Sequence, residues 1–297
     1  VEFACGIPQL LKGEYSANVG SGVDSYNLRQ PLGVCAGITP FNFPAMVPLW
    51  MFPVALACGN TFILKPSEKT PSCPIRMVEL AHEAGVPTDV LSVVNGDKES
   101  VDALLHDPRV RAVSFVGSTP IAEYIYHTGT SKNKRVQALG GAKNHMIVMP
   151  DADVSRVTDA LIGSAFGSAG ERCMAISVAV CVGEETANSV RDAVSAAARK
   201  LNVGPYTDSE SDFGPLSNQT HMNKVVSYID KGVEEGADLV VDGRDLRLQG
   251  YEGGYFVGPC VFDNVTPDMT IYREEIFGPV LGIVRSDSYS EALALVD

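Results

Sequence analysis

The chain has 297 residues, of which 45% are hydrophobic and 20% are charged, an ordinary globular composition that is long enough for two domains. Its formal net charge of -13 argues against nucleic acid and against an anionic membrane surface as the main partner, because both favour basic proteins. The seven cysteines and five histidines show neither disulfide-framework nor metal-ligand spacing, so we expect reduced thiols and no metal site.

The first part of the chain predicts a helix end, a hairpin, a buried strand and a second helix. Apolar residues follow helical spacing over 1–12, whereas 13–31 alternate and contain a glycine turn, which favours a hairpin. Residues 31–38 then have the apolar character of a buried strand. The apolar run 43–58 contains prolines and is shorter than a membrane span, so we expect a buried helix with its entry loop.

The loop between this strand and this helix carries one polar side chain, Asn42, among aromatic residues and prolines. An asparagine in such a loop either bonds its own backbone in a turn or points its amide N–H₂ into a pocket, where it would stabilise an oxyanion. The loop alone leaves both interpretations open.

From Gly59 onward strands alternate with helices, which predicts a parallel sheet with helices on both faces. Lys65 and Glu68 follow the first strand of this run, and Gly117 and Ser118 follow its third, at the sheet edge where α/β proteins bind ligands. A lysine there could meet a phosphate or ribose, and the glycine ahead of a helix could hold a pyrophosphate. No G-x-G-x-x-G motif follows a strand, so this nucleotide site has weak support, and Lys65 could equally be a solvated strand end. We expect strands at 61–64, 90–94 and 112–116 and helices at about 71–84, 98–105 and from Pro120.

The second half of the chain predicts another α/β run. Residues 136–143 are interpreted as a strand that runs into a glycine turn, and helical spacing resumes at Asp151, which we expect to cap a helix that ends near Phe166. Beyond the cysteine segment we expect strands at 176–182 and 238–241 and helices at about 184–200 and 217–235.

The segment 167–177 places Cys173 among glycines and small residues, just before a buried strand. A nucleophilic thiol needs such access, together with backbone N–H groups that can point at a developing negative charge. Arg172 is a neighbouring cation, and a cation favours the thiolate. The competing interpretation is a buried structural cysteine.

Near the end of the chain, Glu274 and Glu275 precede Phe277 and a Gly-Pro turn. The pair could form a solvated acidic turn before a strand. Alternatively, one carboxylate could hold a ribose by its hydroxyls.

Six segments in this order and spacing resemble the aldehyde dehydrogenase superfamily over essentially the whole chain. Two stretches that overlap these segments, 137–145 and 171–175, are most similar to the CoA-acylating methylmalonate-semialdehyde dehydrogenases within it. The six segments are Phe41-Asn42-Phe43-Pro44, Leu64-Lys65-Pro66-Ser67-Glu68, Phe115-Val116-Gly117-Ser118-Thr119, Leu139-Gly140-Gly141, Gly170-Glu171-Arg172-Cys173 and Glu274-Glu275-Ile276-Phe277-Gly278-Pro279.

This resemblance implies a role for each motif. Cys173 would attack the aldehyde carbonyl, the Asn42 amide and the Cys173 backbone N–H would hold the oxyanion, and hydride would pass to NAD, leaving a thioester on Cys173. Methylmalonate or malonate semialdehyde would be the substrate, with acyl transfer to coenzyme A and loss of CO₂, as in valine and pyrimidine catabolism. The implied cofactor-binding residues are Phe41, Lys65, Glu68, Gly117, Ser118, Glu275 and Phe277.

Three positions bear on mechanism within this resemblance. Hydrolytic members begin the glycine turn with a glutamate that serves as general base, whereas this chain has Ala138, which cannot take a proton and so favours transfer to a thiol over hydrolysis. Arg172 could bind the carboxylate of a semialdehyde, lower the pKa of the Cys173 thiol, or form a salt bridge with a structural acid. Ala122 replaces a glycine of many relatives and could alter how the helix meets the pyrophosphate.

The resemblance also implies an aldehyde-dehydrogenase-like α/β fold, truncated at both ends. Residues 1–12 and 32–141 would form a Rossmann-like NAD-binding domain, 13–31 an oligomerisation hairpin, and 142–297 the catalytic domain. We expect a homo-oligomer, a dimer or a tetramer, in a bacterial cytoplasm or alternatively a mitochondrial matrix. The competing functions are a hydrolytic aldehyde dehydrogenase and a non-catalytic protein that kept the fold.

Overall fold

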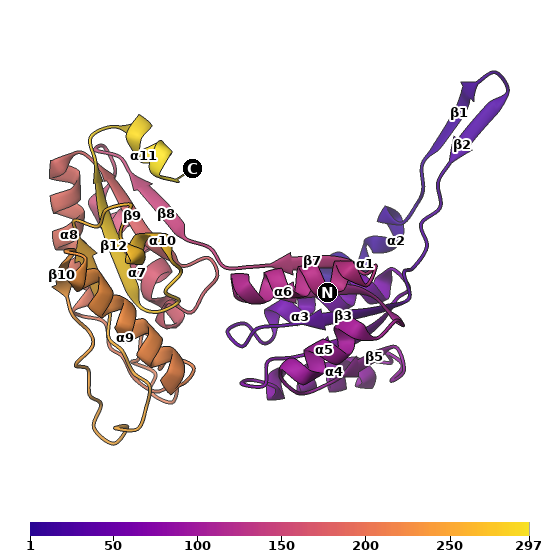
Figure 1. Ribbon diagram of the computed structural model, residues 1–297, viewed down its shortest axis with the longest axis horizontal. Helices are drawn as coiled ribbons and strands as arrows, with labels where there is room; N and C mark the ends of the chain where they lie inside the picture. Colours follow the sequence, from indigo (N-terminus) through magenta and orange to yellow (C-terminus); the bar gives the residue numbers. More distant parts are fainter. Residues whose placement is uncertain (297) are drawn as a thin grey trace. The chain divides into compact units, whose positions relative to one another are not determined.

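The computed structural model describes residues 1–296, and the chain forms two compact units, Val1–Gly141 and a second that begins at Ala142 (Figure 1). Each unit contains a five-stranded sheet, and helices connect most of the strands. The α/β class predicted from the alternation of strands and helices is therefore confirmed in both units.

The sheet of the first unit has the strand order β5-β4-β3-β6-β7, and every neighbouring pair is parallel. Its chain begins in the centre at β3, moves outward through β4 and β5, and then returns to the other side of β3 for β6 and β7. The reversal between β3 and β6 is a topological switch point, beyond whose carboxyl edge open sheets bind ligands. The strands are β3 (Val34–Ile38), β4 (Thr61–Lys65), β5 (Leu91–Val93), β6 (Val110–Val116) and β7 (Arg135–Leu139).

Helices cover both faces of this sheet. Successive residues of β3 belong to different hydrophobic clusters, because Cys35 packs with α3 and α4 whereas Ala36 packs with α5 and α6. Successive strand residues point to opposite faces, so the two clusters mark the two sides of the sheet. The helices are α3 (Met46–Ala57), α4 (Ser72–Glu83), α5 (Lys98–His106) and α6 (Thr119–Ser131).

The start of the chain forms short elements ahead of this sheet. The helix predicted over 1–12 is two short helices, α1 (Glu2–Cys5) and α2 (Ile7–Leu10), which meet at Gly6, with Pro8 in the first turn of α2. The predicted hairpin is confirmed as the antiparallel pair β1 (Tyr15–Gly20) and β2 (Val23–Tyr26), whose residues are all exposed.

The sheet of the second unit has the order β10-β11-β12-β9-β8, with β10 antiparallel and the other pairs parallel. The predicted strands 176–182 and 238–241 are confirmed as β9 and β10, whereas β8 (Asn144–Val148) was not predicted. Helix α7 is capped by Asp153, whose Oδ1 accepts from Ser155 N–H, so the expectation that Asp151 caps it is wrong. The elements are α7 (Val154–Phe166), η1 (Gly167–Gly170), β9 (Ile176–Val182), α8 (Glu184–Ala198), α9 (Gln219–Glu234), β10 (Asp238–Val241), β11 (Cys260–Asp263), α10 (Thr270–Arg273), β12 (Val280–Ser286) and α11 (Tyr289–Val296).

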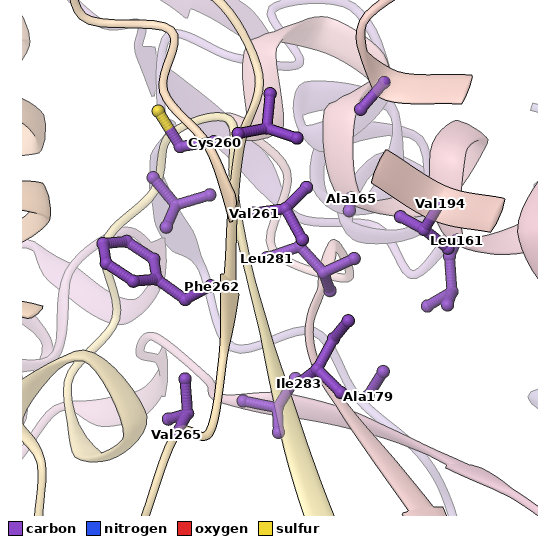
Figure 2. Close-up of a cluster of buried hydrophobic side chains, with 14 of the residues drawn as sticks. Leu161, Ala165, Ala179, Val194, Cys260, Val261, Phe262, Val265, Leu281 and Ile283 are labelled. Carbon is purple, nitrogen blue, oxygen red and sulfur yellow. The ribbon is translucent and has the colours of Figure 1, made fainter. Parts of the chain in front are cut away.

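The core of the second unit lies between this sheet and the helices beside it. Figure 2 shows Leu161 and Ala165 of α7 and Val194 of α8 near side chains from the central strands, among them Leu281 and Ile283. Both strand residues are fully buried, so the sheet gives a rigid base to the loops at its ends.

Within residues 1–296, no helix combines the length and apolar character that crossing a membrane requires.

Candidate active site

The predicted cofactor residues of the first unit lie at one edge of its sheet. Asn42 follows β3, Lys65 is the last residue of β4, and Gly117 follows β6. Because these three neighbouring strands are parallel, their carboxyl ends meet at the same edge. The structure therefore brings together side chains that lie far apart in the sequence, at the switch point where a ligand is expected.

Lys65 is buried, with 3% of its surface exposed, so the alternative of a solvated strand end is wrong. Its Nζ donates to the carbonyl oxygen of Gly96 at 2.8 Å and lies 3.8 Å from Glu68 Oε2. Burial lowers the pKa of the Lys65 ammonium, while Glu68 and Asp97 act in the opposite direction. A buried cation at a strand end is suited to an anionic or hydroxyl-rich ligand.

The turn from β6 into α6 is packed so closely that residue 117 has room only for glycine. A Cβ on Gly117 would lie 2.4 Å from the ring of Phe115. Ser118 is the N-cap residue of α6, and Thr119 Oγ1 accepts the N–H of Gly141 at 3.0 Å. The N-terminus of a 13-residue helix thus follows a close-packed glycine, and although Pro120 contributes no N–H, the dipole of the helix favours a phosphate there.

Phe41, an expected cofactor-binding residue, and Ala122, which replaces a glycine of many relatives, both have clear contacts in the first unit. The carbonyl oxygen of Phe41 accepts from Thr70 Oγ1 at 3.1 Å, and Lys69 Nζ lies 4.6 Å from the centroid of its ring. Ala122 is buried in the cluster that also contains Phe115. Its methyl group therefore supports the packing of α6 on the sheet.

The end of β7 places Ala138 and Leu139 on opposite faces of the strand. Its methyl group packs against the apolar cluster beneath α5 and α6, whereas the next residue, Leu139, is 44% exposed. Successive residues of a strand point to opposite faces, so only one of the two can face a ligand. Both side chains are aliphatic, so whichever of the two faces a ligand, this strand end offers it no proton acceptor.

In the second unit, the loop before Cys173 has an unusual backbone. Ser168 and Ala169 have φ values of 53° and 54°, and Gly170 has 70°. A Cβ on Gly170 would lie 2.1 Å from the carbonyl oxygen of Gly278, so the two backbones touch and only glycine fits. A residue other than glycine at positive φ destabilises the fold by about 1–2 kcal/mol, and such strained residues are common in functional loops.

The side-chain amide of Asn144 holds this loop, a role that was not predicted from the sequence. Its Nδ2 donates to the carbonyl oxygens of Cys173, at 2.9 Å, and of Ala175, at 3.0 Å. One amide therefore fixes the peptide groups that follow Cys173 and Ala175. The only sequence signal was its place in the segment 137–145. Cys173 itself is partly buried.

The side chain of Arg172 reaches back to the C-terminal end of α7. Its Nη1 donates to the carbonyl oxygen of Gly163 at 3.1 Å, which satisfies one of the last carbonyls of the helix. No ion pair among residues 1–296 includes Arg172, so the expected salt bridge with a structural acid is not found. A guanidinium has five N–H donors, so a carboxylate can still be bound.

The two adjacent glutamates of the second unit have different partners. Glu274 Oε2 accepts from the hydroxyl of Tyr228 on α9 at 2.5 Å. Glu275 Oε1 accepts from the backbone N–H of Ala142 at 3.3 Å. Burial and the bond to Glu274 raise the pKa of Tyr228 to about 12. The first carboxylate therefore bonds α9 while Glu274 remains exposed, as in a solvated acidic turn, whereas Glu275 is partly buried and bonded to the backbone.

Lys143 supports the same turn and was also missed. Its Nζ donates to the carbonyl oxygens of Ile271, at 2.6 Å, and Glu274, at 2.9 Å. Burial lowers the pKa of its ammonium to about 8, although Glu275 and Glu274 act in the opposite direction. Lys143 thus binds backbone carbonyl oxygens of the turn, and the N–H of Ala142 binds the carboxylate of Glu275.

Predicted site residues of the second unit share a small cavity of about 20 Å³, enough for about one water molecule. Arg172, Glu275, Phe277 and Asn144 line it. A larger cavity of about 770 Å³ lies between α9 and residues 244–257 and contains none of the predicted site residues. The convergence of polar groups, rather than volume, therefore identifies the candidate site. Across the described part of the chain, no three His, Cys, Asp or Glu side chains form a group that could hold a metal ion.

Each unit by itself has residues that suit a part of NAD. The first unit offers a buried ammonium, a close-packed glycine and a helix N-terminus at one sheet edge, which suit a ribose and a pyrophosphate. The second unit offers the Glu275 carboxylate, which can accept from ribose hydroxyls, beside the aromatic ring of Phe277.

Comparisons with known proteins show what this chain is similar to. The model of the aldehyde dehydrogenase family matches residues 1–297. The chain is 59% identical over 297 residues to a malonate-semialdehyde dehydrogenase of Pseudomonas aeruginosa, covering all of this chain and 60% of that protein. It is 49% identical to the mitochondrial, acylating methylmalonate-semialdehyde dehydrogenase of Arabidopsis thaliana, again over the whole chain and 49% of that protein.

Among solved structures, one from Sinorhizobium meliloti is described as a methylmalonate-semialdehyde dehydrogenase complexed with NAD. It is 60% identical and superposes with a TM-score of 0.97 over 99% of this chain and 60% of that one. The chain thus spans about 60% of the length of the first of these curated relatives.

Proposed function

Because this chain belongs to the aldehyde dehydrogenase family, we propose that the whole protein oxidises malonate or methylmalonate semialdehyde with NAD and transfers the acyl group to coenzyme A. The observation that carries the proposal is the cysteine loop, where strained backbone and the Asn144 amide fix Cys173. The bacterial relatives support a bacterial cytoplasm as its location.

The chemistry begins at Cys173. Its thiolate adds to the aldehyde carbon, and the resulting oxyanion accepts hydrogen bonds from the Asn42 amide and the Cys173 backbone N–H. When bound, NAD accepts the hydride that leaves the thiohemiacetal carbon. Loss of the hydride alone converts the thiohemiacetal oxyanion into a thioester on Cys173, because the oxygen carries no proton and its electron pair forms the carbonyl bond. Arg172 would hold the substrate carboxylate with N–H groups beyond the one that Gly163 occupies.

The second half of the reaction follows from the end of β7. Ala138 and Leu139 cannot accept a proton, so neither can activate a water molecule against the thioester. The thiolate of coenzyme A needs no such base, because it attacks the thioester carbon directly and Cys173 leaves as a thiolate. The acyl group therefore remains on Cys173 until the second thiol arrives.

A single assay separates transfer from hydrolysis. NADH formation by the whole protein is followed with malonate semialdehyde and NAD, with and without coenzyme A, and Cys173→Ser is the matched control. We expect steady turnover only with coenzyme A, at most one equivalent of NADH without it, and none from the variant. Steady turnover without coenzyme A would contradict transfer and favour the hydrolytic function.

The hairpin β1–β2 supports a second part of the proposal, a homo-oligomer. Its large apolar residues Tyr15, Val19, Val23 and Tyr26 are more than half exposed. A two-stranded hairpin is marginal in water unless another surface covers it. We expect sedimentation of the whole protein to give a dimer or larger, and Val19→Asp with Val23→Asp to shift it towards the monomer.

A further inference from the structure

A single histidine bridges the two strained segments of the second unit. Nε2 of His221 lies 2.7 Å from the carbonyl oxygen of Phe277 and 3.4 Å from Oε1 of Glu171. A carbonyl oxygen only accepts hydrogen bonds, so this nitrogen carries the proton and donates towards both oxygens. Glu171 lies two residues before Cys173, and Phe277 follows the Glu275 turn by two residues.

Both ends of this bridge are buried and held. Glu171 is 7% exposed, although carboxylates are rarely buried without partners, and its Oε1 also accepts the N–H of Ser217 at 3.1 Å. The imidazole lies edge-on to the ring of Phe277, with 6.2 Å between centroids. Asn218, the N-cap of α9, accepts the N–H of His221 at 2.8 Å. The backbone of His221 is therefore held at the start of α9, and its side chain contacts both loops from there.

Both segments that His221 joins have strained backbone, which the surrounding structure must enforce. The cysteine loop has three successive residues at positive φ, and Phe277 has a φ of 61°. Aromatic residues rarely adopt this conformation, which persists only where the surroundings enforce it. The backbones of Gly170 and Gly278 already touch, so a shift of either loop moves the other.

We propose that His221 is a positioning residue that, through Glu171 and the carbonyl of Phe277, keeps the Cys173 loop and the Phe277 turn in one relative arrangement. Its effect on turnover rests on the proposed function, but its effect on the thiol does not. The bond that matters is the N–H from Nε2, and a glutamine of similar reach can supply such a donor.

Three variants of the whole protein test this role. His221→Leu removes the donor, His221→Gln keeps one, and Thr220→Ala changes an exposed residue in the same turn of α9. The rate at which iodoacetamide labels Cys173, read by mass spectrometry of its peptide, needs no substrate. NAD affinity and turnover with malonate semialdehyde and coenzyme A complete the set, and thermal unfolding identifies any variant that has lost its fold.

We expect His221→Leu to change the Cys173 labelling rate by about fivefold or more and to lower turnover by roughly 10- to 100-fold, the range for losing a bond to a charged partner. His221→Gln should return both to within about threefold of wild type, on the same grounds, and Thr220→Ala should leave both unchanged. Wild-type labelling in a folded His221→Leu, or no rescue by His221→Gln, overturns the positioning role. If wild type lacks turnover, the proposed function fails, and the labelling series still decides on His221.

Discussion

Lys143 is the most sharply testable side chain in the second unit, because a partly buried ammonium is held there by two carbonyl oxygens. We consider Lys143→Met, which keeps the length of the side chain and removes its charge. In the folded wild-type protein the pKa of Lys143 is about 8, against 10.5 for an ordinary lysine. Between pH 8 and 10.5 the folded state has lost this proton while the unfolded chain still binds it.

The sign follows from proton linkage. The unfolded state binds more protons in this range, so the free energy of unfolding of the wild type rises with pH relative to the variant. Below pH 8 both states are protonated, and the full cost of burying the charge is present. From pH 7 to pH 10 the relative gain is about 2 to 3 kcal/mol, or roughly 30- to 150-fold in an opening equilibrium.

Two cysteines inside the second unit report this opening. Cys181 in β9 and Cys260 in β11 are fully buried, and burial raises the pKa of each thiol to about 12. A thiol reagent therefore reaches them only when the unit opens. Comparing variant and wild type at one pH cancels the pH dependence of the reagent and of every group that the two proteins share.

We expect the labelling rate of these cysteines in Lys143→Met, divided by the wild-type rate, to rise by roughly 30- to 150-fold from pH 7 to pH 10. The same ratio for Lys200→Met, at an exposed lysine after α8, should stay constant. A Lys143→Met ratio that stays constant within about threefold would refute the reasoning, because burial would then not disfavour the charged lysine.

Three more predictions concern the candidate site. Gly170→Ala places a methyl group 2.1 Å from a facing carbonyl oxygen at a φ of 70°, so urea unfolding should show a loss of about 2 kcal/mol or more and Cys173 labelling should change. Asn144→Leu removes two donors from the cysteine loop and should lower turnover about tenfold, while NAD affinity, measured by titration calorimetry, changes by less than about twofold. Glu275→Gln should weaken NAD binding about tenfold, whereas equal weakening by the matched control Glu274→Gln would argue against the assignment of the ribose to Glu275.

Local patterns were sufficient for much of the fold. The strand at 176–182, the helix that follows it and the α/β alternation all appear in the structure, because apolar spacing and turn residues act between neighbours in the chain. Strand β8 was missed because Asn144 and His145 interrupt its apolar run. The order of the motifs identified the family before any geometry was known, and it made Cys173 the candidate nucleophile.

The supporting residues of the site could not be predicted in this way. Asn144 meets the carbonyl of Cys173 across 29 residues, His221 meets Phe277 across 56, and Lys143 meets Ile271 across 128. No periodicity relates partners so far apart, because the packing of β8, α9 and α10 brings them together. The sequence alone thus identified the family and a candidate nucleophile, whereas only the tertiary structure decided which buried polar groups hold the loop of that cysteine, since burial and hydrogen-bond geometry arise when the elements pack.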